Sequence, residues 1–102
     1  MEKHVLNIGL YDKGSKQQEI DTITAFKIVT NLIKKYYSGA TIKQTTGIYT
    51  HESGEIVTEP SLEISILYGE QKKTLALVAD LKRALNQESI LLEIVRTNVN
   101  FI

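Results

Sequence analysis

The chain has 102 residues, of which 42% are hydrophobic and 24% are charged, a composition typical of one soluble globular domain over residues 1–102. Lys and Arg number 12 and Asp and Glu also number 12, so no net charge draws the chain to nucleic acid or anionic lipid. The absence of cysteine excludes disulfides, thiolate zinc sites and cysteine nucleophiles. Apolar runs such as 90–92 are far shorter than the ~20 residues that cross a bilayer, so we expect a cytoplasmic protein with no membrane partner.

The first half of the chain predicts a strand, a helix and a second strand. Apolar residues alternate over 4–12, with Leu6, Ile8 and Leu10 on one side, which is typical of a strand. After a polar loop, apolar residues recur at spacings of three and four, which predicts a helix over 22–37 on the residues Ile23, Phe26, Val29, Ile33 and Tyr36 or Tyr37. Residues 40–50 alternate again, and their threonines favour an edge strand.

The second half predicts a hairpin partner, a helix and a last strand. Gly54 can supply the positive φ of a tight turn, so 40–50 and the strand that begins at Ile56 form a long hairpin arm. Pro60 cannot donate to a sheet ladder and therefore predicts a bulge or an unpaired edge. An apolar stripe predicts a helix over 72–86, on the residues Leu75, Val78, Leu81 and Leu85. Residues 89–95 predict the fourth strand, and an apolar tail follows it.

This order, β-α-β-β-α-β, predicts a ferredoxin-like α+β fold with a four-stranded antiparallel sheet and two helices on one face. The other face is then left open. Its expected residues are more apolar than solvent requires, namely Tyr11, Ser65, Leu67, Leu91, Glu93 and Val95. Together with the tail residues Phe101 and Ile102, this face predicts a homo-oligomer.

The sequence contains no recognisable catalytic set, so we expect no catalytic residue, no metal site and no cofactor. The only histidines, His4 and His51, are interpreted as surface residues because neither has neighbours at ligand spacing. Glu52, Glu55 and Glu59 are interpreted as solvated residues of the arm. The isolated glycines form no phosphate loop, and no serine lies in a nucleophile elbow.

Tyrosines lie on or beside three of the predicted strands, at Tyr11, Tyr49 and Tyr68. They could form a stacking platform, but no basic groove accompanies them. Packing in the core or at an interface is therefore the favoured role.

The stretch 47–61 (GIYTHESGEIVTEPS), the stretch 86–92 (NQESILL) and the stretch 8–11 (IGLY) resemble the DUF3574 family of small bacterial domains of unknown function. In that family a Gly-x-aromatic, turn, Glu-x-Ser hairpin accompanies a Gln-Glu-Ser element before the last strand, and Tyr49 stands where many members carry tryptophan. The chain is also similar to the PII-like signalling proteins in strand order and in its long excursion between the second and third strands. It lacks their basic phosphate-binding residues, so that resemblance implies no site.

The leading hypothesis is a non-catalytic oligomer that binds a small molecule, such as a nucleotide, or a protein partner. Binding would use the open sheet face and the 49–61 arm, through the residues Tyr11, Tyr49, His51, Glu52 and Glu59. One alternative is an enzyme of the dimeric α+β barrel type, in which His51, Glu59 and Tyr49 perform acid-base work. Another is a phage-type inhibitor that sequesters a nucleotide signal or blocks a host protein.

Overall fold

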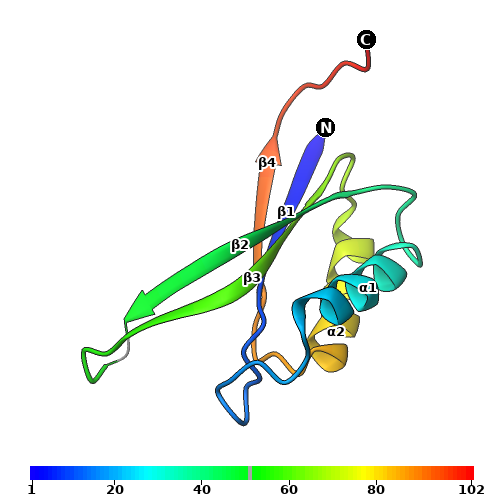
Figure 1. The fold of residues 1–102 in the computed structure, drawn as a ribbon. Coiled ribbons are helices and arrows are strands. Elements are labelled where there is room, and N and C mark those ends of the chain that lie inside the picture. The colour runs from blue at the N-terminus through cyan, green and yellow to red at the C-terminus, as the bar shows by residue number, and fades with distance from the viewer. Residues whose placement is uncertain (51) are drawn as a thin grey trace.

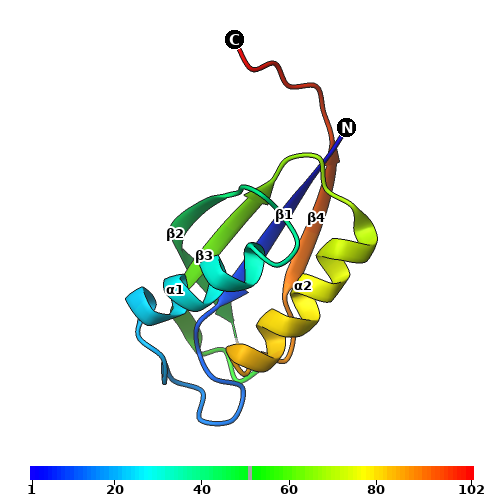
Figure 2. The same cartoon turned by 90° about the vertical axis from the view of Figure 1, so that its right-hand side faces the viewer.

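The computed structural model describes residues 1–50 and 52–102. The four strands form one antiparallel sheet in the order β2-β3-β1-β4, and both helices cover the same face of it (Figure 1 and Figure 2). The predicted ferredoxin-like α+β fold is therefore confirmed. In chain order the elements are β1 (Glu2–Gly9), α1 (Thr22–Ile33), β2 (Thr41–Thr50), β3 (Ile56–Ile66), α2 (Gln71–Ala84) and β4 (Leu91–Arg96).

The core lies between the sheet and the two helices. Even-numbered side chains of β1 and β3 face the helices, since successive residues of a strand point to opposite faces. The fully buried ones include Leu6, Ile8, Leu62 and Ile64. Helix α1 adds Ala25, Val29 and Ile33, and α2 adds Leu77 and Leu81. Neither helix among the described residues is long and apolar enough to span a membrane.

Helix α1 begins and ends through specific backbone contacts. The Asp21 carboxylate accepts the Thr24 backbone N–H at 2.7 Å, which caps the first turn and lowers the pKa of Asp21. The helix ends at Ile33, so the predicted end at Tyr37 is wrong. The reason is that the Tyr36 N–H bonds to the Ile33 carbonyl three residues back, at 3.0 Å, and the chain leaves through turns. Tyr36 and Tyr37 still pack on the core, which is why the apolar spacing continued past the helix.

Each helix buries a face slightly different from the predicted stripe. Ile23, Phe26 and Leu75 were expected in the core, but 68%, 41% and 59% of their surfaces are exposed. The small residues Ala25 and Thr74 are fully buried instead. A short side chain lets the helix approach the sheet closely. The spacing of the large apolar residues did not predict that these two small residues would be the buried ones.

Pro60 lies within β3 without the predicted bulge. It pairs with Thr46 in a register that continues unbroken through Gly47–Glu59 and Thr45–Ser61. In an antiparallel strand the N–H and C=O of one residue point to the same neighbour. The Pro60 carbonyl accepts the Leu10 N–H at 2.9 Å, so Pro60 turns the backbone nitrogen that lacks a hydrogen toward β1 as well. The β2–β3 ladder therefore loses no hydrogen bond at Pro60.

The hairpin arm is the part of β2 and β3 that extends beyond the rest of the sheet, residues 46–60. The register of β1 with β3 ends at Gly9–Ser61, and beyond the bond from the Leu10 N–H to the Pro60 carbonyl the two arm strands continue as a ladder with each other. Figure 1 shows the arm projecting from the sheet, and the molecule measures 46 × 25 × 24 Å. Gly54 turns the chain with φ of 89°, as predicted.

Candidate functional site

Three segments that are distant in sequence meet at the base of the hairpin arm. They are the end of β1 and the residues after it, the Glu59 region of β3, and the turn after α2. With Tyr49 of β2 they line a hollow of about 330 Å³, here named the Glu59 hollow. The stretches that resemble DUF3574 contribute residues to all three segments. The wall is formed by Gly9, Tyr11, Asp12, Lys13, Lys16, Tyr49, Glu59, Gln87, Glu88 and Ser89.

Glu59 is fixed within this hollow by a backbone donor. Its Oε2 accepts the Tyr11 N–H at 3.0 Å, a contact between residues 48 positions apart. A hydrogen bond from a backbone amide to a carboxylate is among the stronger protein hydrogen bonds. Glu59 and Tyr49 lie on the hairpin face that points away from the helices, because the even-numbered residues of β3 face the core. Glu59 is thus held as an acceptor beside an aromatic ring.

The Tyr11 backbone is held from its other side by the turn that follows α2. The buried Gln87 donates its Nε2–H to the Tyr11 carbonyl at 2.9 Å and to the Leu85 carbonyl at 3.2 Å. The Lys13 N–H also donates to the Asn86 carbonyl at 3.0 Å. The peptide groups flanking Tyr11 are therefore clamped between β3 and the end of α2.

Asp12 stabilises the loop that forms one wall of the hollow. Its carboxylate accepts the Asn86 amide at 2.7 Å and the Gly14 and Ser15 N–H groups at 2.8 and 3.2 Å. These donors, the Asn86 amide first, lower the pKa of Asp12. Since both oxygens are engaged within the chain, Asp12 supports the loop rather than offering a free acceptor.

A second and larger hollow, of about 550 Å³, shares Tyr11 and Glu59 with the first. Hydroxyl and amide side chains dominate its wall, so we name it the threonine hollow. The other residues that line it are Thr22, Gln44, Thr45, Thr46, Thr58, Pro60 and Ser61. Glu59 therefore stands at the junction of two open depressions.

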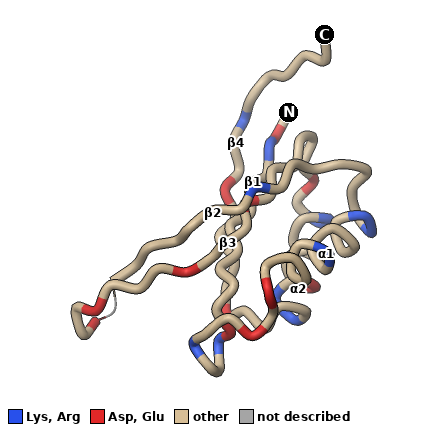
Figure 3. Tube along the Cα trace, viewed as in Figure 1, with Lys and Arg blue, Asp and Glu red and all other residues tan. Residues whose placement is uncertain are grey.

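The charge of this region favours cationic or neutral ligands. Figure 3 shows acidic positions but neither Lys nor Arg on the arm, and the sequence has neither from residue 44 to residue 61. Lys13 and Lys16, which lie outside the arm, also line the Glu59 hollow. Within residues 1–50 and 52–102, no group of three or more His, Asp or Glu side chains is arranged to hold a metal ion.

The structure brings together three of the five predicted binding residues. Tyr11, Tyr49 and Glu59 line one hollow, whereas Glu52 lies exposed at the tip of the arm and takes no part in it. His51 lies outside the described residues. Gln87 was not among the predicted binding residues. It was named from the sequence only as part of the stretch 86–92 that resembles DUF3574.

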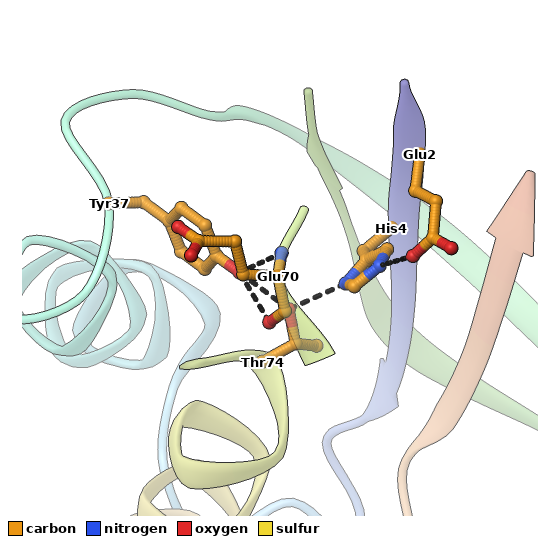
Figure 4. A network of polar contacts seen from close by, with 5 residues as sticks. All are labelled: Glu2, His4, Tyr37, Glu70 and Thr74. Atoms are coloured by element: carbon orange, nitrogen blue, oxygen red, sulfur yellow. Dashed lines mark hydrogen bonds and ion pairs between the residues drawn. The ribbon is translucent and has the colours of Figure 1, made fainter. Parts of the chain in front are cut away.

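His4 was expected on the surface, and this is wrong: it is fully buried. Its Nδ1 lies 2.6 Å from Thr74 Oγ1 and its Nε2 lies 3.0 Å from Glu2 Oε1 (Figure 4). The Tyr37 hydroxyl lies 2.8 Å from the same Thr74 oxygen and accepts the Glu70 N–H at 2.9 Å. These contacts join β1 to the start of α2, so His4 is a structural residue remote from the Glu59 hollow.

No protein family matches the chain, and no curated protein matches it. Among solved structures, the chain is similar to a phage SAM (S-adenosylmethionine) lyase in complex with S-methyl-5′-thioadenosine. The identity is 27%, the match covers 92% of this chain and 79% of that chain, and the TM-score is 0.66. A phage SAM lyase in the apo state gives 25% identity, 92% and 78% coverage, and a TM-score of 0.66.

A more distant likeness extends to the periplasmic divalent cation tolerance protein CutA from Archaeoglobus fulgidus. The identity is 12%, the match covers 99% of this chain and 88% of that chain, and the TM-score is 0.62. The GlnK–ATP complex of B. subtilis also gives 12% identity, with 97% and 88% coverage and a TM-score of 0.56. At these identities the likeness concerns the fold alone.

Proposed function

We propose that the chain binds S-adenosylmethionine in the Glu59 hollow and cleaves it to release S-methyl-5′-thioadenosine. The observation that carries the proposal is the Glu59 carboxylate, anchored by the Tyr11 N–H in a hollow that also presents the ring of Tyr49. The likeness to the phage SAM lyase supports it, since that protein is similar over 92% of this chain and was seen with the same thioadenosine.

The charge and size of the hollow suit this ligand class. S-adenosylmethionine carries a positive sulfonium and a positive ammonium, and an arm with carboxylates and no Lys or Arg attracts such groups. The two hollows, about 330 and 550 Å³, fall within the usual range for small-molecule sites. The Tyr49 ring can stack on adenine or face the sulfonium. A nucleoside polyphosphate would meet Glu59 and Glu88 as well as Lys13 and Lys16, and no phosphate loop is present in the sequence.

The reaction requires no nucleophilic side chain, which agrees with a sequence that has no cysteine and no nucleophile elbow. The bond between sulfur and the γ-carbon of the methionine part breaks, and its electron pair turns the sulfonium into a neutral thioether. An oxygen of the substrate's own carboxylate forms the new bond to that carbon, so atoms and charge balance without water. The protein then has to orient one molecule and keep water away, and such positioning alone gives large accelerations.

Glu59 has a binding role in this account. Its other carboxylate oxygen, Oε1, accepts a hydrogen bond from the substrate ammonium or a ribose hydroxyl, while Oε2 stays on the Tyr11 N–H. A hydrogen bond to a charged group contributes about 1.5–3 kcal/mol, or roughly 10- to 100-fold in affinity. The non-catalytic binder expected from the sequence differs from this proposal in one measurable respect, which is turnover.

The test is to incubate the purified protein with S-adenosylmethionine and to quantify S-methyl-5′-thioadenosine by liquid chromatography. We expect product from the wild type and at least about a tenfold loss for Glu59→Gln. Glu63→Gln is the matched control, since it changes another carboxylate of β3 outside both hollows, and it should retain wild-type activity. Ligand binding without product would reject the lyase and leave a binding protein. If the protein shows neither ligand binding nor product, the proposed site is rejected.

The homo-oligomer stays a prediction. Large apolar side chains are exposed at Ile48 and Ile56 on the arm, at Leu91 on β4 and at Phe101 and Ile102 in the tail. Burying such surfaces against a second copy is the ordinary reason for their presence on a small domain. Light scattering at micromolar concentration tests this, and a monomer throughout that range would contradict it.

A further inference from the structure

We propose that Gly9 and Gln87 are positioning residues for Glu59 in the cleavage of S-adenosylmethionine. Gly9 has no side chain in the space that the carboxylate occupies. Gln87 holds the carbonyl of Tyr11, the residue whose N–H binds the carboxylate. This inference rests on the proposed function, because it assigns both residues to the same site.

The argument for Gly9 is steric. A Cβ at this position would lie 2.6 Å from Cδ and 2.7 Å from Oε2 of Glu59, closer than non-bonded atoms approach. The backbone of Gly9 does not adopt a positive φ, so alanine fits its conformation. The atoms in conflict belong to the end of a flexible side chain, which can turn away while the sheet stays intact. A methyl group at position 9 therefore expels the carboxylate and preserves the fold.

The argument for Gln87 follows from its hydrogen bonds. Its Nε2 donates both of its hydrogens, one to the Tyr11 carbonyl and one to the Leu85 carbonyl. Tyr11 lies after the end of β1, where the strand no longer fixes the backbone. The Tyr11 carbonyl belongs to the peptide group that follows Tyr11, and the Tyr11 N–H belongs to the peptide group that precedes it. By holding the following group, the Gln87 amide restricts the backbone rotation at Tyr11 that would turn its N–H away from Glu59. Gln87 is itself buried and also lines the hollow.

These two contacts explain how a glutamate at the base of an arm acquires one defined geometry. A glutamate side chain has several rotatable bonds and ordinarily samples many rotamers in solvent. Here the absence of a side chain at Gly9 admits the carboxylate, and the Tyr11 N–H retains it while Gln87 holds the carbonyl of the same residue. Both residues act through Glu59, so their effects on turnover depend on that carboxylate.

The test is a double-mutant cycle on turnover, with the free energy of unfolding measured in parallel. We expect Gly9→Ala to lower kcat/KM at least about tenfold while the midpoint of urea unfolding is unchanged or rises. Glu59→Asp shortens the side chain and removes the steric conflict, so adding Gly9→Ala to Glu59→Asp should cause no further loss. The same factor of loss in both backgrounds, or a fully active Gly9→Ala, would overturn the role of Gly9.

For Gln87 the variant is Gln87→Met, which keeps the length of the side chain and removes both donors. We expect a loss of turnover that is not additive with Gly9→Ala, and a shift of the Tyr11 amide proton resonance, which a merely structural loss elsewhere would not move. An unchanged Tyr11 resonance with full activity would overturn the role of Gln87. A wild type that yields no product would reject the proposed function and this inference with it. An active wild type with active variants would reject the inference alone.

Discussion

Replacing Thr74 with valine removes the central hydroxyl of the buried network around His4. Thr74 and His4 are both fully buried, and Thr74 Oγ1 is the partner of His4 Nδ1 at 2.6 Å and of the Tyr37 hydroxyl at 2.8 Å. Valine keeps the shape but leaves the His4 nitrogen without its partner. An unsatisfied buried polar group costs about 1–3 kcal/mol, and each kcal/mol lowers Tm by about 4–8 °C in a domain of this size.

The assay is urea unfolding followed by circular dichroism, with Thr30→Val as the matched control. The Thr30 hydroxyl donates to the Phe26 carbonyl on the surface of α1, its one side-chain bond within residues 1–50 and 52–102, so its loss should change stability by no more than about 0.5 kcal/mol. Thr74→Val should lower the midpoint clearly and leave the m-value unchanged. If both variants lose the same small amount of unfolding free energy, the network around His4 contributes nothing to stability and the reasoning is refuted.

Three further predictions concern the core, acid stability and the ligand. Gly69→Ala should be strongly destabilising, because its Cβ would lie 2.6 Å from Nδ1 of His4, a buried ring that cannot move aside; a near-native melting temperature would contradict this. The Tyr36 hydroxyl, and after it the Lys35 ammonium, lower the pKa of Asp80 below its ordinary 3.8. The ionised Asp80 therefore stabilises the folded state fully above that pH, and this contribution is lost as the pH falls through the lower pKa of the folded state. Asp80→Asn should thus make the free energy of unfolding depend less on pH in the acid range. Tyr49→Ala should abolish S-methyl-5′-thioadenosine binding in calorimetry with little change in Tm, since 40% of the residue is exposed; a large fall in Tm would assign Tyr49 to packing.

The order of elements could be read from the sequence because alternation and helical spacing are local properties. Leu6, Ile8 and Leu10 alternate over adjacent positions, and their burial follows from the period of the strand. The end of α1 and the burial of Ala25 were not predictable in this way. They depend on how closely the helix approaches the sheet, which large apolar residues alone do not reveal.

The candidate site could be predicted only in part, because its contacts are long-range. Glu59 and Tyr11 were both named from the sequence, but their hydrogen bond joins two segments whose register was not known. His4 was misjudged for the same reason, since its partner Thr74 lies 70 positions away. Gln87 gave no chemical signal of its own, because its role exists only through the Tyr11 carbonyl.

The most direct test of the central claim is an amide NMR titration of the wild-type chain with S-methyl-5′-thioadenosine. If the Glu59 hollow binds this nucleoside, the largest shifts will appear at the Gly9 and Tyr11 backbone amides and at the Gln87 side-chain amide. Thr74 belongs to the remote network around His4, so the resonance of its backbone amide should not shift. No saturable shift at the hollow, or shifts confined to another surface, would contradict the account.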